Sequence, residues 1–258
     1  MKQLEIDQFA CLDDNYGYLI HDPASGQTAT IDTPDAKAIS ARLSARGWTL
    51  THIFNTHHHY DHTGGNLELK ESTQCQIIGP ACESEKIPGL DRAIDQDDMI
   101  EFGEHYFEIL NVGGHTLGHI AYFHRLQEIA FVGDALFAMG CGRLFEGTAA
   151  QMWASLSRLN RLPAETLIYC AHEYTSANAA FALSIDPENP ALQKRVEAVK
   201  ALRAADQPTI PTSLAEERAT NPFLRVDDPA IRSFLNMDKA AHVDVFAEIR
   251  SRKDNFQG

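Results

Sequence analysis

One stretch carries most of the chemical information in this chain: Thr56-His57-His58-His59-Tyr60-Asp61-His62-Thr63-Gly64-Gly65. It follows the strand pattern His52–Asn55 and precedes a predicted helix, so we expect a loop at the carboxyl edge of a sheet, where functional loops gather. Side chains two apart in an extended loop point the same way, which lets His57 and His59 converge on one ion. Asp61 and His62 lie just beyond and can turn toward a second ion. Imidazole and carboxylate ligands suit Zn²⁺, Mn²⁺ and Fe²⁺, so the stretch predicts a class of metal.

Three further ligand-type residues each follow a later predicted strand. His115 comes after Gly113 and Gly114, Asp134 follows Ile129–Val132, and His172 follows Thr166–Tyr169. Taken singly, an aspartate can cap a turn and a histidine can be an ordinary core residue. Together they indicate a metal centre at one edge of the fold.

Two other histidines have less certain roles. His58 lies between two proposed ligands and is expected to point away from the metals, with a structural role. His119 either donates a hydrogen bond that orients a ligand or is a core histidine.

The pattern of strands and helices predicts two regions. Short strands dominate the first two-thirds, whereas Ala-rich, charge-rich helical segments follow after about Ala171. We therefore expect a mixed α/β domain at residues 1–171 and a helical domain at residues 172–258. Within the first domain a helix is predicted over Asp35–Arg46, with Thr33 as N-cap, Pro34 at the first helical position and Gly47 as the stop. Its other predicted helices are Gly65–Glu71 and Ala149–Leu159.

Composition narrows the possible partners and the location. The net charge of −14 argues against a nucleic-acid binder, since phosphate contacts need clustered cations. No run approaches the ~20 apolar residues that cross a bilayer, and the start of the chain resembles a strand, not a signal peptide. The five cysteines are odd in number, without a C-x-x-C pair, so we expect free thiols, each a small core residue, in a cytoplasmic protein.

The order T-H-x-H-x-D-H, then G-H-T, then G-D, then a distal histidine resembles the metallo-β-lactamase superfamily. The resemblance implies an αβ/βα four-layer sandwich with two divalent metals at one edge, zinc in the first instance, with iron or manganese as alternatives. It further implies that His57, His59 and His115 hold the first metal. Asp61, His62 and His172 would then hold the second, with Asp134 bridging both.

Later segments resemble one family within that superfamily, glyoxalase II. They are Gly140–Ala149, Cys170–Thr175, Asn221–Arg225 and Arg250–Phe256, so the likeness spans the helical region that most superfamily members lack. The resemblance implies hydrolysis of S-(2-hydroxyacyl)glutathione, with S-D-lactoylglutathione giving glutathione and D-lactate. A hydroxide bridging the metals would attack the thioester, and Asp61 and Asp134 would be the catalytic carboxylates.

A glutathione pocket needs cations for two carboxylates and aromatic walls. Arg143, Arg250 and Lys253 are the expected carboxylate partners, while Tyr174 supplies a hydroxyl. Without the resemblance, Arg250 and Lys253 would be a solvated helix end. Phe145 is a departure, since some family members carry Tyr there, and its role stays open.

Two alternative functions are compatible with the same sequence features. One is a persulfide dioxygenase of the same superfamily, which uses a single iron and would be distinguished by metal stoichiometry and oxygen uptake. The other is a non-catalytic zinc module, although closed zinc sites usually prefer thiolates and no cysteine occupies a ligand position here. We expect a monomer with a small-molecule glutathione thioester as its partner. The native metals and the acyl selectivity are left open.

Overall fold

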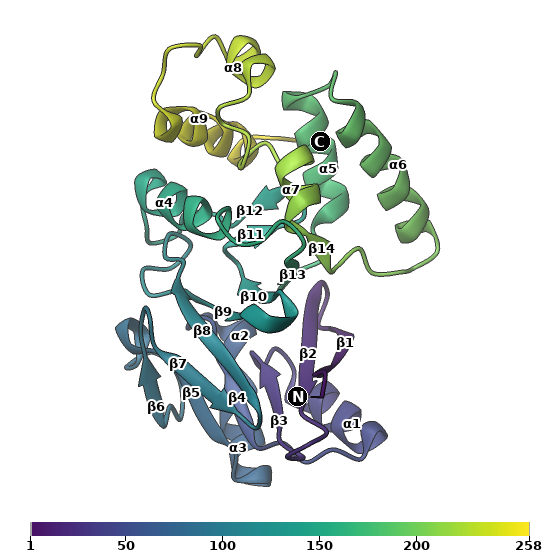
Figure 1. Cartoon of the computed structure of the whole chain (residues 1–258), viewed down its shortest axis with the longest axis vertical. Helices are drawn as coiled ribbons and strands as arrows, with labels where there is room; N and C mark the ends of the chain where they lie inside the picture. Colours follow the sequence, from purple (N-terminus) through teal and green to yellow (C-terminus); the bar gives the residue numbers. More distant parts are fainter. Residues whose placement is uncertain (1, 258) are drawn as a thin grey trace. The chain divides into compact units, whose positions relative to one another are not determined.

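The computed structural model describes residues 2–257, which form two compact units (Figure 1). The first unit comprises the residues up to Asn111 together with Thr116–Gly133. The second comprises Val112–His115 and the residues from Asp134 onward. This division by contacts differs from the predicted boundary between residues 171 and 172, which stays a prediction.

The first unit is built from ten strands and three α-helices. A six-stranded sheet has the order β1-β2-β3-β4-β5-β6, antiparallel from β1 to β3 and parallel from β3 to β6. Strands β7, β8, β9 and β10 pair in that order, all antiparallel. The strands are β1 Glu5–Cys11, β2 Asn15–His21, β3 Thr28–Ile31, β4 His52–Phe54, β5 Gln76–Pro80, β6 Arg92–Ile94, β7 Met99–Phe102, β8 His105–Asn111, β9 Ile120–His124 and β10 Ile129–Gly133. The helices are α1 Ala36–Arg46, α2 Tyr60–Thr63 and α3 Asn66–Thr73, with short 3-10 turns at Ala81–Glu83 and Arg125–Gln127.

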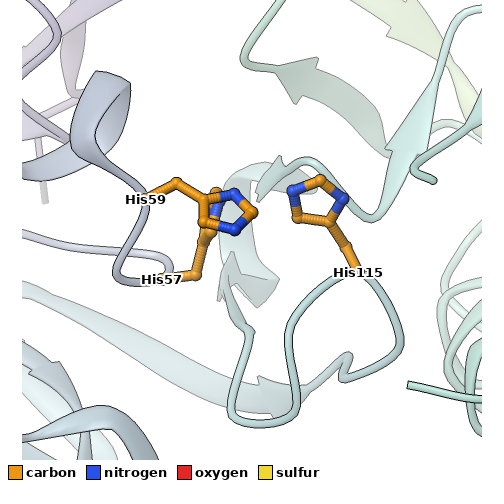
Figure 2. A group of neighbouring side chains, drawn as sticks. All are labelled: His57, His59 and His115. Atoms are coloured by element: carbon orange, nitrogen blue, oxygen red, sulfur yellow. The ribbon is translucent and has the colours of Figure 1, made fainter. Parts of the chain in front are cut away.

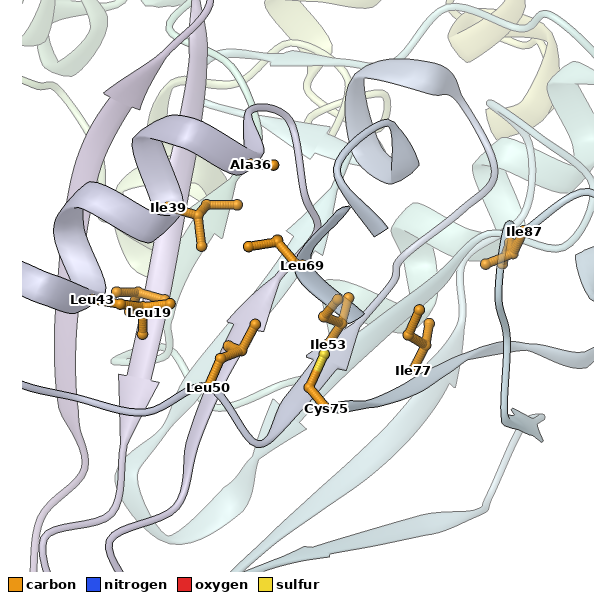
Figure 3. Packing of buried hydrophobic residues seen from close by; sticks show 10 residues of the cluster. All are labelled: Leu19, Ala36, Ile39, Leu43, Leu50, Ile53, Leu69, Cys75, Ile77 and Ile87. Carbon is orange, nitrogen blue, oxygen red and sulfur yellow. The ribbon is translucent and has the colours of Figure 1, made fainter. Parts of the chain in front are cut away.

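Helices α1 and α3 bury their apolar faces against the six-stranded sheet. Ala36, Ile39 and Leu43 recur at helical spacing along α1 and enter one cluster with Leu19 of β2 and Ile53 of β4 (Figure 3). Because this core fixes β4, it also fixes the start of the loop that begins at Asn55.

The start of α1 corrects one prediction. Its N-cap is Asp35, whose carboxylate accepts from the backbone N–H of Lys37 and Ala38 at 2.9 and 3.1 Å. Thr33, predicted as the cap, is fully buried, and its hydroxyl donates instead to Asn66 Oδ1 at 2.7 Å. The predicted stop is confirmed, since Gly47 takes the left-handed conformation with φ 68°.

The second unit contains most of the helices and two short strand pairs. Strands β11 Leu136–Phe137 and β12 Gly140–Cys141 form a hairpin, and β13 Leu167–Cys170 pairs with β14 Thr212–Ser213. The helices are α4 Ala149–Leu159, α5 Thr175–Ile185, α6 Pro190–Ala204, α7 Leu214–Thr220, α8 Pro229–Leu235 and α9 His242–Asp254. The helical segments expected after residue 171 are thus present. The predicted patterns missed α2, α7 and α8 and strands β6, β11, β12 and β14, all of them seven residues or shorter.

The cysteines are free thiols, as expected. Cys11, Cys75, Cys141 and Cys170 are buried, but Cys82 is exposed, so the prediction of a core position was wrong for that residue. Among the described residues, no helix is both long and apolar enough to span a membrane.

Candidate metal and substrate site

The histidine-rich loop begins directly after β4 in the first unit. His57 is fully buried, and its Nε2 lies 3.1 Å from His59 Nδ1, so the two rings meet as their spacing predicts (Figure 2). Helix α2 at Tyr60–Thr63 was not predicted, whereas α3 at Asn66–Thr73 is the helix expected over Gly65–Glu71, and α2 carries Asp61 and His62 on one turn. His62 Nε2 lies 3.5 Å from Asp61 Oδ2. The four ligand-type residues of this stretch therefore come together.

A buried carboxylate, which the sequence analysis did not single out, holds this loop in place. Asp32 directly follows β3 and has φ 57°, an uncommon conformation that aspartate tolerates better than most residues. Its oxygens accept from the Thr56 backbone N–H at 2.7 Å, the Thr56 hydroxyl at 2.8 Å and His62 Nδ1 at 2.8 Å. An aspartate at a strand end was the available signal, but such residues also end many ordinary strands.

These hydrogen bonds assign the tautomers of two histidines. A carboxylate only accepts, so His62 Nδ1 carries its proton and leaves the Nε2 lone pair for a metal. The Thr56 hydroxyl already donates to Asp32, so its oxygen accepts from His57 Nδ1 at 3.0 Å. His57 Nε2 is then also left as a lone pair. Asp32 thus sets the tautomers of His57 and His62 together.

Three neighbours complete the surroundings of the loop. Asn15, at the start of β2, donates its amide to Asp61 Oδ2 at 3.2 Å and orients that carboxylate. His58 turns to Glu83, with Nδ1 2.8 Å from Oε2, which gives it the structural contact that was expected. His119 is fully buried and stacks on the His57 ring, with centroids 4.5 Å apart and an interplanar angle of 18°. It therefore packs directly against a ligand-type residue.

The second unit brings together the other three ligand-type residues. Asp134 lies between two histidines, with Oδ2 3.3 Å from His115 Nε2 and Oδ1 3.3 Å from His172 Nε2. His115 projects from a loop of its own (Figure 2), and its Nδ1 donates to the Arg143 carbonyl at 2.9 Å, which leaves Nε2 as the lone pair. Gly142 is required here, because a Cβ at that position would lie 2.0 Å from the Asp134 carbonyl oxygen.

A cavity of about 460 Å³ opens beside His115 and Asp134 in the second unit. All five residues expected to contact substrate line it: Arg143, Phe145, Tyr174, Arg250 and Lys253. Phe137, Cys141, Ala177 and Asn178 complete the lining.

Helix α9 carries two of the cations that line this cavity, Arg250 and Lys253. Arg250 is 4% exposed, and its guanidinium donates to the Cys141 carbonyl at 2.9 Å and to Asp254 Oδ1 at 2.7 and 3.1 Å. Desolvation, then the positive charges of Arg250 and Arg143, lower the pKa of Lys253 to about 8. Burial raises the pKa of the Cys141 thiol to about 11, so it is protonated at neutral pH.

Aromatic rings link this cavity to the histidines. Tyr174 stacks on His172, with centroids 4.7 Å apart and planes 2° from parallel. Phe145 meets the His115 ring edge-on at 5.2 Å, and 63% of the phenylalanine is exposed. Both rings therefore contact a ligand-type histidine and line the cavity.

Comparison with known proteins now places the chain. Residues 17–172 match the model of the metallo-beta-lactamase superfamily, and residues 173–256 match the model described as hydroxyacylglutathione hydrolase C-terminus. The hydroxyacylglutathione hydrolase of Maricaulis maris is 55% identical over 256 residues, covering 99% of this chain and 100% of the relative. That of Hyphomonas neptunium is 54% identical, covering 98% of each chain. The chain belongs to the hydroxyacylglutathione hydrolase family.

Solved structures agree on the fold of this hydroxyacylglutathione hydrolase family member. ETHE1 from Myxococcus xanthus is 26% identical with a TM-score of 0.64, covering 96% of this chain and 97% of its own. The BLEG-1 B3 metallo-beta-lactamase is 19% identical with a TM-score of 0.65, covering 85% and 99%, and its likeness concerns the fold alone. The predicted superfamily, fold class and glyoxalase II resemblance are confirmed.

The donor atoms fit the divalent metals that membership of this metallohydrolase family implies. They are imidazole nitrogens and carboxylate oxygens, which suit such ions without any thiolate. Two ligand atoms each about 2.0–2.1 Å from a tetrahedral ion lie roughly 3.3–3.4 Å apart. The observed separations within each unit are 3.1 Å for His57 to His59 and 3.3 Å for Asp134 to each of its histidines.

Proposed function

We propose that the chain hydrolyses S-(2-hydroxyacyl)glutathione, with S-D-lactoylglutathione as substrate and glutathione and D-lactate as products. One observation carries the proposal: a single cavity is lined both by cationic and aromatic residues and by the ligand-type residues His115 and Asp134. The relatives named hydroxyacylglutathione hydrolase, 51–55% identical over nearly the whole chain, support the same reaction.

The proposed metal ligands are the seven residues predicted from the sequence. His57, His59 and His115 would hold one ion, Asp61, His62 and His172 the other, with Asp134 shared. We propose zinc for both ions, because imidazole nitrogen and carboxylate oxygen are donors that suit it. Such ions, when bound, polarise the thioester carbonyl and lower the pKa of a water molecule toward neutrality.

The cavity residues divide the work of binding glutathione. Arg143 and Lys253 supply cations for the two carboxylates of the peptide. Arg250 already donates to the Cys141 carbonyl and to Asp254. It therefore contributes positive charge and shape to the cavity rather than a full bidentate ion pair with the substrate. Tyr174 presents its hydroxyl edge from a ring fixed on His172, and Phe145 covers the peptide by apolar contact.

The leaving group explains why no further catalytic acid is needed. A thiol has a pKa near ~8.5, so glutathione departs as a thiolate with little protonation. Asp61, held by Asn15, would orient the attacking water, and Asp134 places one oxygen beside Nε2 of His115 and the other beside Nε2 of His172.

The proposal extends to the setting of the reaction. We propose a monomer acting in the cytoplasm, with neither nucleic acid nor membrane as a partner. The net charge of −14 supports the absence of nucleic-acid and membrane partners, because it opposes binding to phosphate-rich surfaces.

The test is hydrolysis of S-D-lactoylglutathione by the purified protein, following thiol release, with metal content measured on the same sample. Rapid release that disappears on chelation and returns with zinc is the expected result. No release from a fully metallated sample would reject the substrate. Oxygen uptake with glutathione persulfide would instead favour the dioxygenase alternative, which the full-length relatives already disfavour.

A further inference from the structure

The hairpin β11–β12 occupies a central place in the second unit, yet it is too short to be stable alone. Its strands have two residues each, with Leu136 opposite Cys141 and Phe137 opposite Gly140. An isolated hairpin of this size is not stable in water. Its turn also contains Met139 at φ 54°, a left-handed conformation that is unfavourable for a residue other than glycine. Something outside the hairpin must therefore hold it.

Side chains from three helical elements do so by binding its backbone groups one by one. The carbonyls of Phe137 and Gly140 accept from the amide of Asn221 at 3.2 and 3.0 Å. The Ala138 carbonyl accepts from Asn178 at 3.1 Å. The Met139 N–H donates to Glu217 Oε2 at 2.9 Å, and the Cys141 carbonyl accepts from Arg250 at 2.9 Å. We call these four side chains the hairpin cradle: Asn178, Glu217, Asn221 and Arg250.

The cradle is itself fixed by buried contacts. Glu217, fully buried, pairs with Arg195 at 2.5 Å through Oε1 and accepts from Asn221 at 2.9 Å through Oε2. The Met139 side chain inserts into the apolar cluster of α5 and α6, among residues such as Ala182 and Val196. Gly140 permits the close approach of Asn178, since a Cβ there would lie 2.4 Å from the amide nitrogen. The conformation of the hairpin is thus set by the helices.

One end of this hairpin leads to a proposed metal ligand, and the other end leads to a residue whose backbone contacts a second one. Asp134 lies two residues before β11, and Arg143, whose carbonyl accepts from His115 Nδ1, lies two residues after β12. The backbone carbonyl of His115 also accepts from the N–H of Phe145 at 3.2 Å. A shift of the hairpin would therefore move Asp134 and the hydrogen bond that fixes the His115 ring.

We propose that the hairpin cradle positions Asp134 and His115 for metal binding, and that Asn221 is its central positioning residue. This inference rests on the ligand roles proposed above. It gives the helical region a second task beside substrate binding, because its side chains determine the metal affinity of residues outside it.

The test compares Asn221→Asp with Ile231→Ala. Asn221→Asp keeps the shape of the side chain but turns a carboxylate oxygen toward two carbonyls and Glu217. Ile231, fully buried in α8, is a control for a loss of stability that does not involve the cradle. Zinc affinity is measured by competition with a chelator, beside kcat, KM and thermal unfolding without metal.

Asn221→Asp should bind zinc about 10–100-fold more weakly and have a lower kcat. A loss of this size is typical when a residue that supports a metal ligand is replaced. Ile231→Ala should unfold at a lower temperature with wild-type zinc affinity. Wild-type affinity in folded Asn221→Asp would overturn the proposal. If that variant does not fold, Asn178→Ala, which removes one donor only, replaces it: weaker zinc binding supports the cradle and unchanged binding overturns it. A wild-type protein that binds no zinc would reject the proposed metal ligands instead.

Discussion

The replacement Asp32→Asn is the most informative single change in the first unit. Asparagine has the same shape and also tolerates positive φ, so the backbone at φ 57° is undisturbed. One amide oxygen can still accept from the Thr56 N–H. The amide NH₂ then faces the Thr56 hydroxyl and His62 Nδ1, both of which donate in the wild-type protein.

The expected size of the effect follows from those contacts. To accept from the new amide, His62 must move its proton to Nε2, which removes the lone pair that would bind a metal. Changes of this kind cost about 10–100-fold in metal affinity, or roughly 1.4–2.8 kcal/mol. Loss of one hydrogen bond to a charged group should also lower the free energy of unfolding by about 1.5–3 kcal/mol without metal. Because Thr56 relays the effect to His57, both proposed ions should be affected.

The assay is a zinc titration against a competing chelator, with stoichiometry and hydrolysis rates measured on the same preparations. Asp91→Asn is the matched control, since Asp91 lies directly before β6 in the first unit and also accepts from a backbone N–H, that of Ile77, and from a side chain, that of Lys70. This replacement also removes one negative charge, but outside the histidine-rich loop, and it should leave zinc affinity unchanged. The reasoning is refuted if Asp32→Asn binds two zinc ions as tightly as the wild-type protein.

Three further outcomes follow from the structure. The KM for the thioester should rise as pH increases through about 8, because Lys253, with its pKa lowered to about 8 by desolvation and the charges of Arg250 and Arg143, then becomes neutral. Initial rates of Lys253→Arg across the same range should show no such rise, and an identical rise would remove Lys253 as the cause. Phe145→Tyr should lower KM about 2- to 12-fold in steady-state assays, since a net hydrogen bond contributes about 0.5–1.5 kcal/mol; an unchanged KM would mean that the new hydroxyl meets solvent. Ile39→Ala should reduce the free energy of unfolding in urea by about 2–5 kcal/mol with full metal content, and a loss of metal would contradict the separation of core and site.

The ligand-type residues were predictable because each lies within a few residues after a strand with a clear pattern. His57, Asp134 and His172 come after β4, β10 and β13, and short apolar strands are the strongest local signal in this chain. The hairpin β11–β12 was not predictable in the same way. Its two-residue strands carry no periodicity, and its shape depends on side chains up to 109 residues away in sequence, such as Arg250 on Cys141.

The supporting residues were missed for a related reason. Asp32 and Asn15 act on His62 and Asp61 across 30 and 46 positions, so nothing in their local sequence distinguishes them from turn residues. The N-cap of α1 was misplaced because Thr33 forms a buried hydrogen bond with Asn66, a tertiary contact that outweighs a local preference. Local patterns therefore identified the ligand-type residues but not the contacts that orient them.

The unequal exposure of the cysteines has a practical consequence for following the reaction. Burial raises the pKa of the thiols of Cys11, Cys75, Cys141 and Cys170, which leaves them protonated and shielded from reagents. Cys82 is the one exposed thiol in residues 2–257. A chromogenic disulfide reagent that detects released glutathione should therefore meet a protein background of about one fast-reacting thiol per chain. Changing Cys82 to serine would leave an enzyme whose own sulfur is almost invisible to the assay.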